Sequence, residues 1–188
     1  TWKGEQMGKP KIVVLGAGLG GTIAAYEIKA AVKDKAEVMT VSDSETYSFV
    51  PSNPWVAVRW REPEAIQVHL PPVFAKKKIG FTAVGAKRLH PAEKRIELND
   101  GSWLDYDWLV IATGPDLAFD EIEGLGPHGG HTVSVCQTAH AASAADAFDA
   151  FCDNPGPIVV GAVQAASCFG PAYEFALILD TELRRRKI

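Results

Sequence analysis

The sequence lacks most features that mark secreted, metal-binding or membrane-spanning proteins. Its 188 residues contain only three cysteines, Cys136, Cys152 and Cys168, and this odd number at wide spacing fits neither a zinc site nor a set of paired disulfides. No apolar run approaches the roughly 20 residues that a membrane-spanning helix needs. Residues 1–10 also lack the apolar core of a signal peptide, so we expect a leader without regular structure there.

The sequence also lacks a dominant charge of either sign. Its formal net charge is −4, and the basic clusters are confined to residues 76–78 and 184–187. Both clusters lie at expected helix ends, where cations interact favourably with the helix dipole. Nucleic acid is therefore not an expected partner. The apolar share of 47% is enough to bury the core of one domain or slightly more.

Residues 11–137 show the pattern of a Rossmann-like α/β domain. An apolar strand at 11–16, a helix at 22–32 and a strand at 36–43 predict a right-handed βαβ unit. We expect further strands at 79–84, 87–91, 94–106 and 107–114, with a hairpin turn at 99–101, as in a parallel sheet accompanied by a small β-meander. The strand at 107–114 is nearly all apolar, which is typical of a buried parallel strand. Residues 43–63 are expected to form a long irregular loop with a functional role.

The remaining residues predict the beginning of a second domain. After a short strand at 132–136, residues 138–155 form an Ala-rich connecting helix with Thr138 as its N-cap. Residues 156–188 then predict a strand at 157–161 and a helix that begins near Gly170 or Pro171, the first βα unit of a second Rossmann-like domain. A lone βα unit cannot bury both faces of a sheet, so we expect the chain to be part of a longer protein.

A dinucleotide-binding motif follows the first strand. Gly16, Gly18 and Gly21 form the G-x-G-x-x-G pattern between a strand and a helix. Gly16 allows the tight turn, Gly18 lets the backbone approach a pyrophosphate, and Gly21 permits close helix packing. The N-terminus of the following helix attracts phosphate groups.

The residues that would read the ribose and identify the nucleotide lie further along the chain. The acidic residue that usually binds the ribose is replaced by Ser42, with Asp43 next to it. The glycine pattern alone is compatible with both NAD and FAD. The stretch DWLVIATGP, which contains Ala112, Thr113 and Gly114, is similar to the second flavin motif of flavoproteins with two dinucleotide folds, and it favours FAD.

The turn at residues 161–171 has lost the glycines that a second nucleotide site would need. Laid on the same pattern, Gly161 is followed by Val163 and Ala166, and Cys168 stands where a glutamate is usual. A valine side chain would crowd a pyrophosphate, which disfavours NADH. Cys168 lies just before a helix N-terminus, which lowers thiol pKa values and favours a nucleophilic thiolate. The alternative is a buried, unreactive cysteine. We expect Cys152 to be a small core residue.

Five stretches together resemble the N-terminal half of the sulfide:quinone oxidoreductases: GAGLGG, FVPSNPWVAVRW, YDWLVIATGP, SVCQTAH and GAVQAASCFGPAYE. The resemblance extends from Lys11 to Arg186. It implies FAD as cofactor, with Pro51 and Asn53 among the residues near it. It also implies a cysteine pair that includes Cys168 and oxidises sulfide to sulfur or polysulfide, while electrons leave to quinone.

The resemblance also assigns roles to polar residues near the site. Cys136 matches the family's third redox cysteine, which helps to release the polysulfur product or, in some members, is attached to the flavin methyl group. His140 and Glu174 would manage protons, and the alternatives are an ordinary helix-surface histidine and an ordinary helix-surface carboxylate. The partner of Cys168, most of the quinone pocket and an amphipathic membrane-docking segment would lie in the other half of the protein. That implies a peripheral protein of a prokaryotic inner membrane, and a homo-oligomer is compatible with it.

Three other enzymes and one non-enzyme remain as alternatives. A type II NADH:quinone oxidoreductase and a coenzyme A disulfide reductase share the flavin domain, but Val163, Ala166 and Cys168 argue against the NADH site that both need. The flavin subunit of flavocytochrome c sulfide dehydrogenase would pass electrons to a haem protein instead of quinone. A nucleotide-binding module without catalysis is the alternative from a different class.

Overall fold

The computed structural model describes residues 8–164, 166 and 169–188, which form two compact units. Unit 1 comprises the chain up to Tyr47 together with Val68–Asp116, and unit 2 comprises Ser48–Gln67 and Leu117–Ile188. Most of the predicted leader and the predicted nucleophile Cys168 lie outside the described residues.

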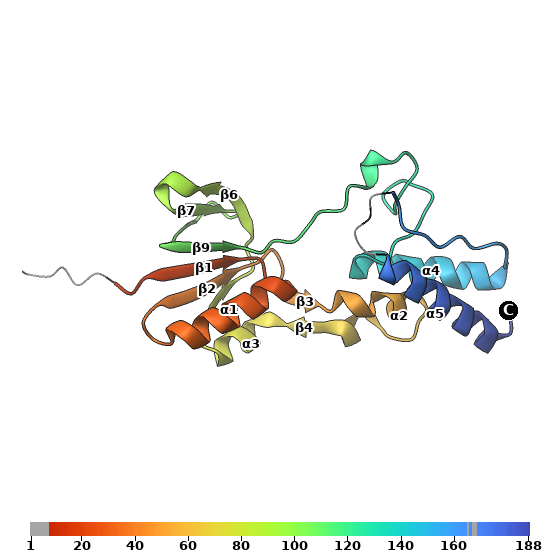
Figure 1. Cartoon of the computed structure of the whole chain (residues 1–188), viewed down its shortest axis with the longest axis horizontal. Helices are drawn as coiled ribbons and strands as arrows, with labels where there is room; N and C mark the ends of the chain where they lie inside the picture. Colours follow the sequence, from red (N-terminus) through yellow and green to blue (C-terminus); the bar gives the residue numbers. More distant parts are fainter. Residues whose placement is uncertain (1–7, 165, 167–168) are drawn as a thin grey trace, which may run out of the picture. The chain divides into compact units, whose positions relative to one another are not determined.

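Unit 1 is built on a parallel sheet of four strands in the order β5-β2-β1-β9 (Figure 1). These strands are β1 (Lys11–Leu15), β2 (Glu37–Val41), β5 (Gly80–Thr82) and β9 (Trp108–Ile111). Helix α1 (Leu19–Val32) connects β1 with β2 and begins three residues earlier than the sequence pattern predicted. The predicted Rossmann-like α/β fold is therefore confirmed.

The sheet of unit 1 is covered on both faces, as the two-residue period of β1 requires. Val14 packs with α1 and with α3 (Leu70–Lys76), whose Phe74 is fully buried. Val13 and Leu15 point to the other face and pack against the meander of β6 (Ala86–His90), β7 (Arg95–Leu98) and β8 (Trp103–Asp105). The predicted hairpin turn joins β7 and β8.

Strand β9 differs from its prediction in one respect. It pairs in parallel with β1, as expected, but it forms the edge of the described sheet. Trp108 and Ile111 consequently keep 69% and 62% of their surface exposed. An apolar sequence is compatible with either position, and only the strand order shows that this strand is not buried on both sides.

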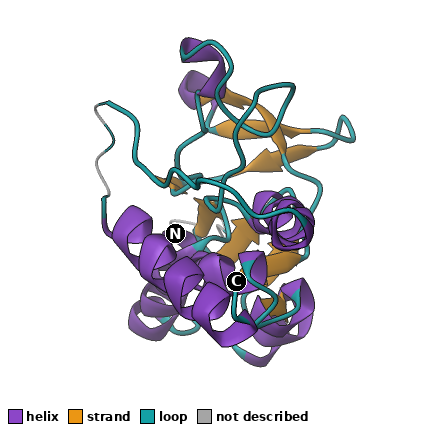
Figure 2. Cartoon of the chain, turned by 90° about the vertical axis from the view of Figure 1, so that its right-hand side faces the viewer, coloured by secondary structure: helices purple, strands orange, loops and turns teal. Residues whose placement is uncertain are grey.

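Unit 2 consists mainly of helices (Figures 1 and 2). Three of them contribute side chains to its buried core. The helices are α2 (Asn53–Ala57), α4 (Thr138–Asp153) and α5 (Gly170–Arg186), with short 3₁₀ turns at Val50–Ser52, Pro63–Ile66 and Phe119–Glu121. The chain passes between the units along β3 (Thr46–Ser48) and β4 (Gln67–His69), which form a two-stranded sheet. The segment predicted to be irregular thus contains a helix, whose second residue is Pro54.

Two predicted strands and one predicted cap are wrong. Neither residues 132–136 nor residues 157–161 form a strand, and Val159 is 96% exposed. A strand needs a neighbour for its backbone hydrogen bonds, and no described residue pairs with these two segments. The N-cap of α4 is Gln137, and Thr138 is the first residue of the helix.

Helix α5 carries a buried carboxylate among basic residues. Glu182 is 1% exposed and accepts hydrogen bonds from Trp60 Nε1 at 2.7 Å and from Arg186 Nε at 2.8 Å. Arg185 also forms an ion pair with this carboxylate. Burial opposes ionisation, but the bonds from Trp60 and Arg186 and the positive charges of Arg185 and Arg186 together outweigh it, so the pKa of Glu182 lies below its ordinary value. The basic cluster at residues 184–187 ends the helix, as predicted. None of the helices described is long and apolar enough to span a bilayer.

Candidate functional site

The glycine turn of unit 1 is packed on its inner side and open on its outer side. Gly16 has φ +106°, and a Cβ there would overlap the carbonyl oxygen of Ala112. A Cβ at Gly21 would overlap the carbonyl oxygen of Gly16. By contrast, nothing lies within 4 Å of a Cβ built on Gly18. This is the geometry of a turn whose outer surface can accept a pyrophosphate against the backbone.

Backbone hydrogen bonds bring the ends of three parallel strands to this turn. Gly16 N donates to Val41 O at 2.8 Å, and Ala112 N donates to Leu15 O at 2.7 Å. The predicted residues that follow β1, β2 and β9 therefore lie together at the carboxyl ends of these strands. Ligands of open α/β sheets bind beyond the carboxyl ends of the strands. The first turn of α1 contains no acidic residue, which leaves its N-terminus suited to phosphate.

Ser42, the residue predicted to bind the ribose, is held by hydrogen bonds to neighbouring backbone. Ser42 N donates to Thr82 O at 2.9 Å, and its Oγ accepts a bond from Ser44 N at 3.3 Å, so the hydroxyl proton is available to a ligand. Asp43 is exposed next to it. Gly114 has φ +77° with open space around it, and it follows Thr113 after β9. These residues fit the adenosine and pyrophosphate part of a dinucleotide such as FAD.

Two further predicted cofactor residues, Pro51 and Asn53, belong to unit 2. Asn53 is fully buried, its Nδ2 donates to Val135 O at 2.9 Å, and its Oδ1 accepts from Thr138 Oγ1 at 3.0 Å. The side chain therefore holds the chain on both sides of Cys136, whose own side chain is exposed. A direct contact of Asn53 or Pro51 with the cofactor stays a prediction.

His140 lies in the first turn of α4 and is only 6% exposed, so the alternative of a helix-surface histidine is wrong. Its Nε2 lies 3.1 Å from Nε2 of His128, and its Nδ1 is buried without a hydrogen-bond partner. Burial, and secondly the positive charge that His128 can carry, lower the pKa of His140. The sequence did not reveal His128, because it lies in a Gly- and Pro-rich loop without periodicity.

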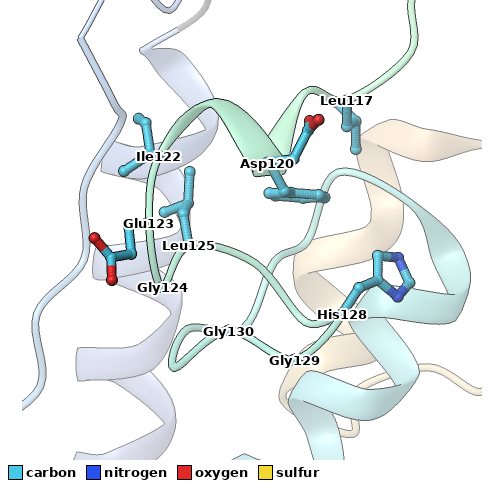
Figure 3. Close-up of a pocket in the computed structure, with 10 residues that line it drawn as sticks. Leu117, Asp120, Ile122, Glu123, Gly124, Leu125, His128, Gly129 and Gly130 are labelled. Carbon is cyan, nitrogen blue, oxygen red and sulfur yellow. The ribbon is translucent and has the colours of Figure 1, made fainter.

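The loop that carries His128 also lines the hollow drawn in Figure 3, which encloses about 330 Å³. Its lining comes entirely from residues 117–130 of unit 2. None of the predicted site residues lines this hollow, so sequence reasoning did not find it.

The other predicted polar residues of unit 2 have ordinary surroundings. Glu174 is exposed on α5, which leaves both its predicted role and the alternative open. Cys152 is half-buried and packs against the core of α4 and α5, as predicted. Helix α5 starts at Gly170, as predicted for the helix that follows Cys168 in the sequence.

The parallel sheet, the glycine turn and the converging strand ends together define a Rossmann-type dinucleotide-binding protein. Residues 10–163 match the family described as pyridine nucleotide-disulphide oxidoreductase, and the chain belongs to this family. Its members are flavoprotein oxidoreductases.

Within the family, the chain is a homologue of the sulfide:quinone oxidoreductases. It is 38% identical over 177 residues to the sulfide-quinone reductase of Aquifex aeolicus, covering 94% of this chain and 40% of that protein. The X-ray structure of the Aquifex aeolicus sulfide:quinone oxidoreductase matches over the same shares of the two chains, with a TM-score of 0.87 and 37% identity. The mitochondrial sulfide:quinone oxidoreductase of Dictyostelium discoideum is 28% identical over 120 residues, which cover 61% of this chain and 25% of that protein.

A more distant similarity is to a persulfide reductase. The structure of a NAD-dependent persulfide reductase from A. fulgidus matches 74% of this chain and 27% of its own, with a TM-score of 0.62 and 26% identity. The chain thus spans well under half the length of each of these relatives.

Proposed function

We propose that this chain provides the FAD-binding domain and two redox cysteines, Cys168 and Cys136, of an enzyme that oxidises sulfide and passes the electrons to a membrane quinone. The observation that carries the proposal is the 38% identity to a sulfide-quinone reductase over 94% of the chain. The degenerate turn at residues 161–166 supports it, because Val163 stands where a nicotinamide nucleotide would need a glycine.

The residues of unit 1 would hold the cofactor. The outer face of the turn at Gly18 and the N-terminus of α1 would bind the pyrophosphate, and Ser42 with Asp43 would bind the ribose. Bound FAD would supply the two-electron redox chemistry between sulfide and quinone. The other contribution of the chain is to place thiols and proton carriers.

The thiol chemistry would centre on Cys168. Hydrosulfide would attack a sulfur–sulfur bond that involves this cysteine, and the bond would break with its electron pair on the departing thiolate. The position of Cys168 in the sequence, just before a helix, would favour its thiolate form. The exposed Cys136 would receive sulfur for release, and His140 would carry protons. Oxidation of hydrosulfide to zero-valent sulfur releases one proton and two electrons, so a proton path is needed.

The decisive experiment is the visible spectrum of the protein in its full natural length, titrated anaerobically with sulfide and separately with NADH. We expect sulfide to bleach the flavin absorbance and NADH to leave it unchanged. In Cys168→Ala sulfide should no longer bleach the flavin, whereas the matched variant Cys152→Ala should behave as the natural protein. Bleaching by NADH, or by sulfide in Cys168→Ala, would overturn the proposal.

A further inference from the structure

A group of three aromatic rings in unit 2 joins a buried histidine to an exposed one. His128 and His140 face each other with ring centroids 5.0 Å apart and an interplanar angle of 70°. Phe119 presents an edge-to-face contact to both, with centroids 6.3 Å from His128 and 5.6 Å from His140. Phe119 has no side-chain nitrogen or oxygen, so the bond between Nε2 of His128 and Nε2 of His140 is the conventional hydrogen bond within this group.

The two histidines differ sharply in their access to water. His140 is 6% exposed, and its Nδ1 is buried without a partner. His128 is exposed and belongs to the lining of the hollow formed by residues 117–130. In Figure 3 its ring lies on the side of the hollow next to α4. The pair is thus a short polar connection between a buried ring and the solvent.

The loop is shaped to hold this arrangement. Gly126 has φ +90°, and a Cβ there would lie 2.5 Å from Cγ of Phe119, so only glycine lets Phe119 pack beside the histidines. Gly126 N donates to Thr132 Oγ1 at 2.7 Å, which fastens the loop two residues before His128. These contacts hold the loop around Phe119 and His128 in a defined conformation, which a loop without a role in positioning side chains would not require.

We propose that His128 is a positioning residue for His140: at rest it holds the buried ring in the neutral tautomer with hydrogen on Nε2 and connects it to water, so that the pair can transfer a proton. A neutral imidazole has one N–H donor and one acceptor nitrogen, so one Nε2 of the pair donates and the other accepts. The hydrogen bond made by one ring nitrogen decides the state of the other.

The transfer balances in protons. When a proton arrives at Nδ1 of His140, His140 transfers the proton on its Nε2 to Nε2 of His128. His128 then releases the proton on its own Nδ1 to water. Both rings end neutral, each with its hydrogen on the other nitrogen. As a path for the proton released from hydrosulfide, this inference rests on the proposed function, but the pairing itself can be tested without turnover.

Among the described residues, the elements that pack on α4 beside the pair carry few titratable groups. Helix α2, which packs on α4, contains no charged residue, and the 3₁₀ turn at Pro63–Ile66 adds Glu64. The loop contributes Asp120 and Glu123, whose carboxylates point in different directions in Figure 3. Cys136 lies four residues before His140 in the sequence.

The test is a side-chain ¹⁵N NMR titration of this chain between pH 5 and 9, with His128→Gln and His128→Leu. We expect His140 in the natural chain to show a single neutral tautomer. His128→Gln keeps a hydrogen-bonding amide and should keep that tautomer, while the pKa of His140 rises because the neighbouring charge is lost. His128→Leu should give a mixture of tautomers. The exposed His131 serves as the control, and His131→Gln should change neither property of His140.

A tautomer ratio and a titration of His140 that are the same in the natural chain and in both His128 variants would overturn the inference. If His128→Leu does not fold, His128→Gln still decides, because its predicted effect is on the titration. In the full-length protein, His128→Ala should slow the reduction of flavin by sulfide by about tenfold or more, and added imidazole should restore the rate. Absence of sulfide activity in the unaltered protein would count against the proposed function and leave the NMR result standing.

Discussion

At the scale of single residues, the three glycines of the first turn have separate physical tasks. Gly16 and Gly21 lie so close to backbone oxygens, of Ala112 and of Gly16 respectively, that a Cβ would overlap them. Gly18 faces open space. Substitution should therefore harm folding at the first two positions and ligand binding at the third. This distinction comes from the surroundings of each Cα and is not visible in the motif.

Gly18→Ala should fold normally and bind FAD about tenfold more weakly or worse, because the new methyl group occupies the space into which a pyrophosphate would move. Gly18 has φ −68°, which alanine adopts without strain. Gly20→Ala is the matched control, since a Cβ there also meets nothing within 4 Å. Quenching of flavin fluorescence on binding measures both affinities, and equal affinities would argue against a pyrophosphate at Gly18.

Asn53 is the second residue whose role depends on tertiary contacts. Asn53→Ala should lower the free energy of unfolding by about 2 kcal/mol, because it leaves a partly buried carbonyl and a partly buried hydroxyl without their partner. Chemical denaturation followed by circular dichroism measures the loss. Ser143→Ala, which removes an exposed hydroxyl bond to Ala139 O, is the control and should change stability little. A loss of similar size in the control would contradict the explanation.

At the scale of elements, α5 illustrates how a helix acquires a pH-dependent contribution to stability. The pKa of Glu182 is lower in the folded than in the unfolded chain, because burial is outweighed by the bonds from Trp60 and Arg186 together with the charges of Arg185 and Arg186. A lowered folded pKa stabilises the fold above the unfolded pKa, and the contribution is lost as pH falls through the folded pKa.

Glu182→Gln should therefore reduce stability at pH 7, and the difference from the natural chain should shrink as the pH falls below the ordinary range of glutamate. The amide retains an acceptor for Trp60 but loses the charge that pairs with Arg185 and Arg186. Thermal unfolding of both chains between pH 3 and 7 tests this. Asp180→Asn changes an exposed carboxylate of the same helix, and a larger effect there than at Glu182 would contradict the prediction.

At the scale of the whole molecule, two units with separate buried clusters share one chain that crosses between them along β3 and β4. Phe74→Ala should cost unit 1 about 3–5 kcal/mol, since Phe74 is fully buried among Tyr26 and Phe81. Hydrogen exchange should show reduced protection of the amides of β1 and β2. Phe169→Ala, at an exposed site in unit 2, is the control, and unchanged protection of β1 and β2 in Phe74→Ala would contradict the prediction.

The sequence predicted much of unit 1 because its evidence is local. The apolar run of β1, the glycine turn and the hairpin residues each depend on near neighbours, and together they indicated the fold class and the residues at its strand ends. The same reasoning was wrong at residues 132–136 and 157–161. Apolar composition predicted strands there, but a strand forms only when another strand pairs with it. The residues of the segment do not determine that pairing.

By itself, the sequence determined the Rossmann-like fold, the dinucleotide turn and the candidate thiols, since these follow from local backbone requirements and residue chemistry. The tertiary structure decided which glycine of the motif faces open space, placed β9 at the edge of the described sheet, buried Asn53 and Glu182, and brought His128 to His140. The physical reason is that burial and hydrogen-bond partnership depend on side chains distant in the sequence, and only the folded chain brings these together.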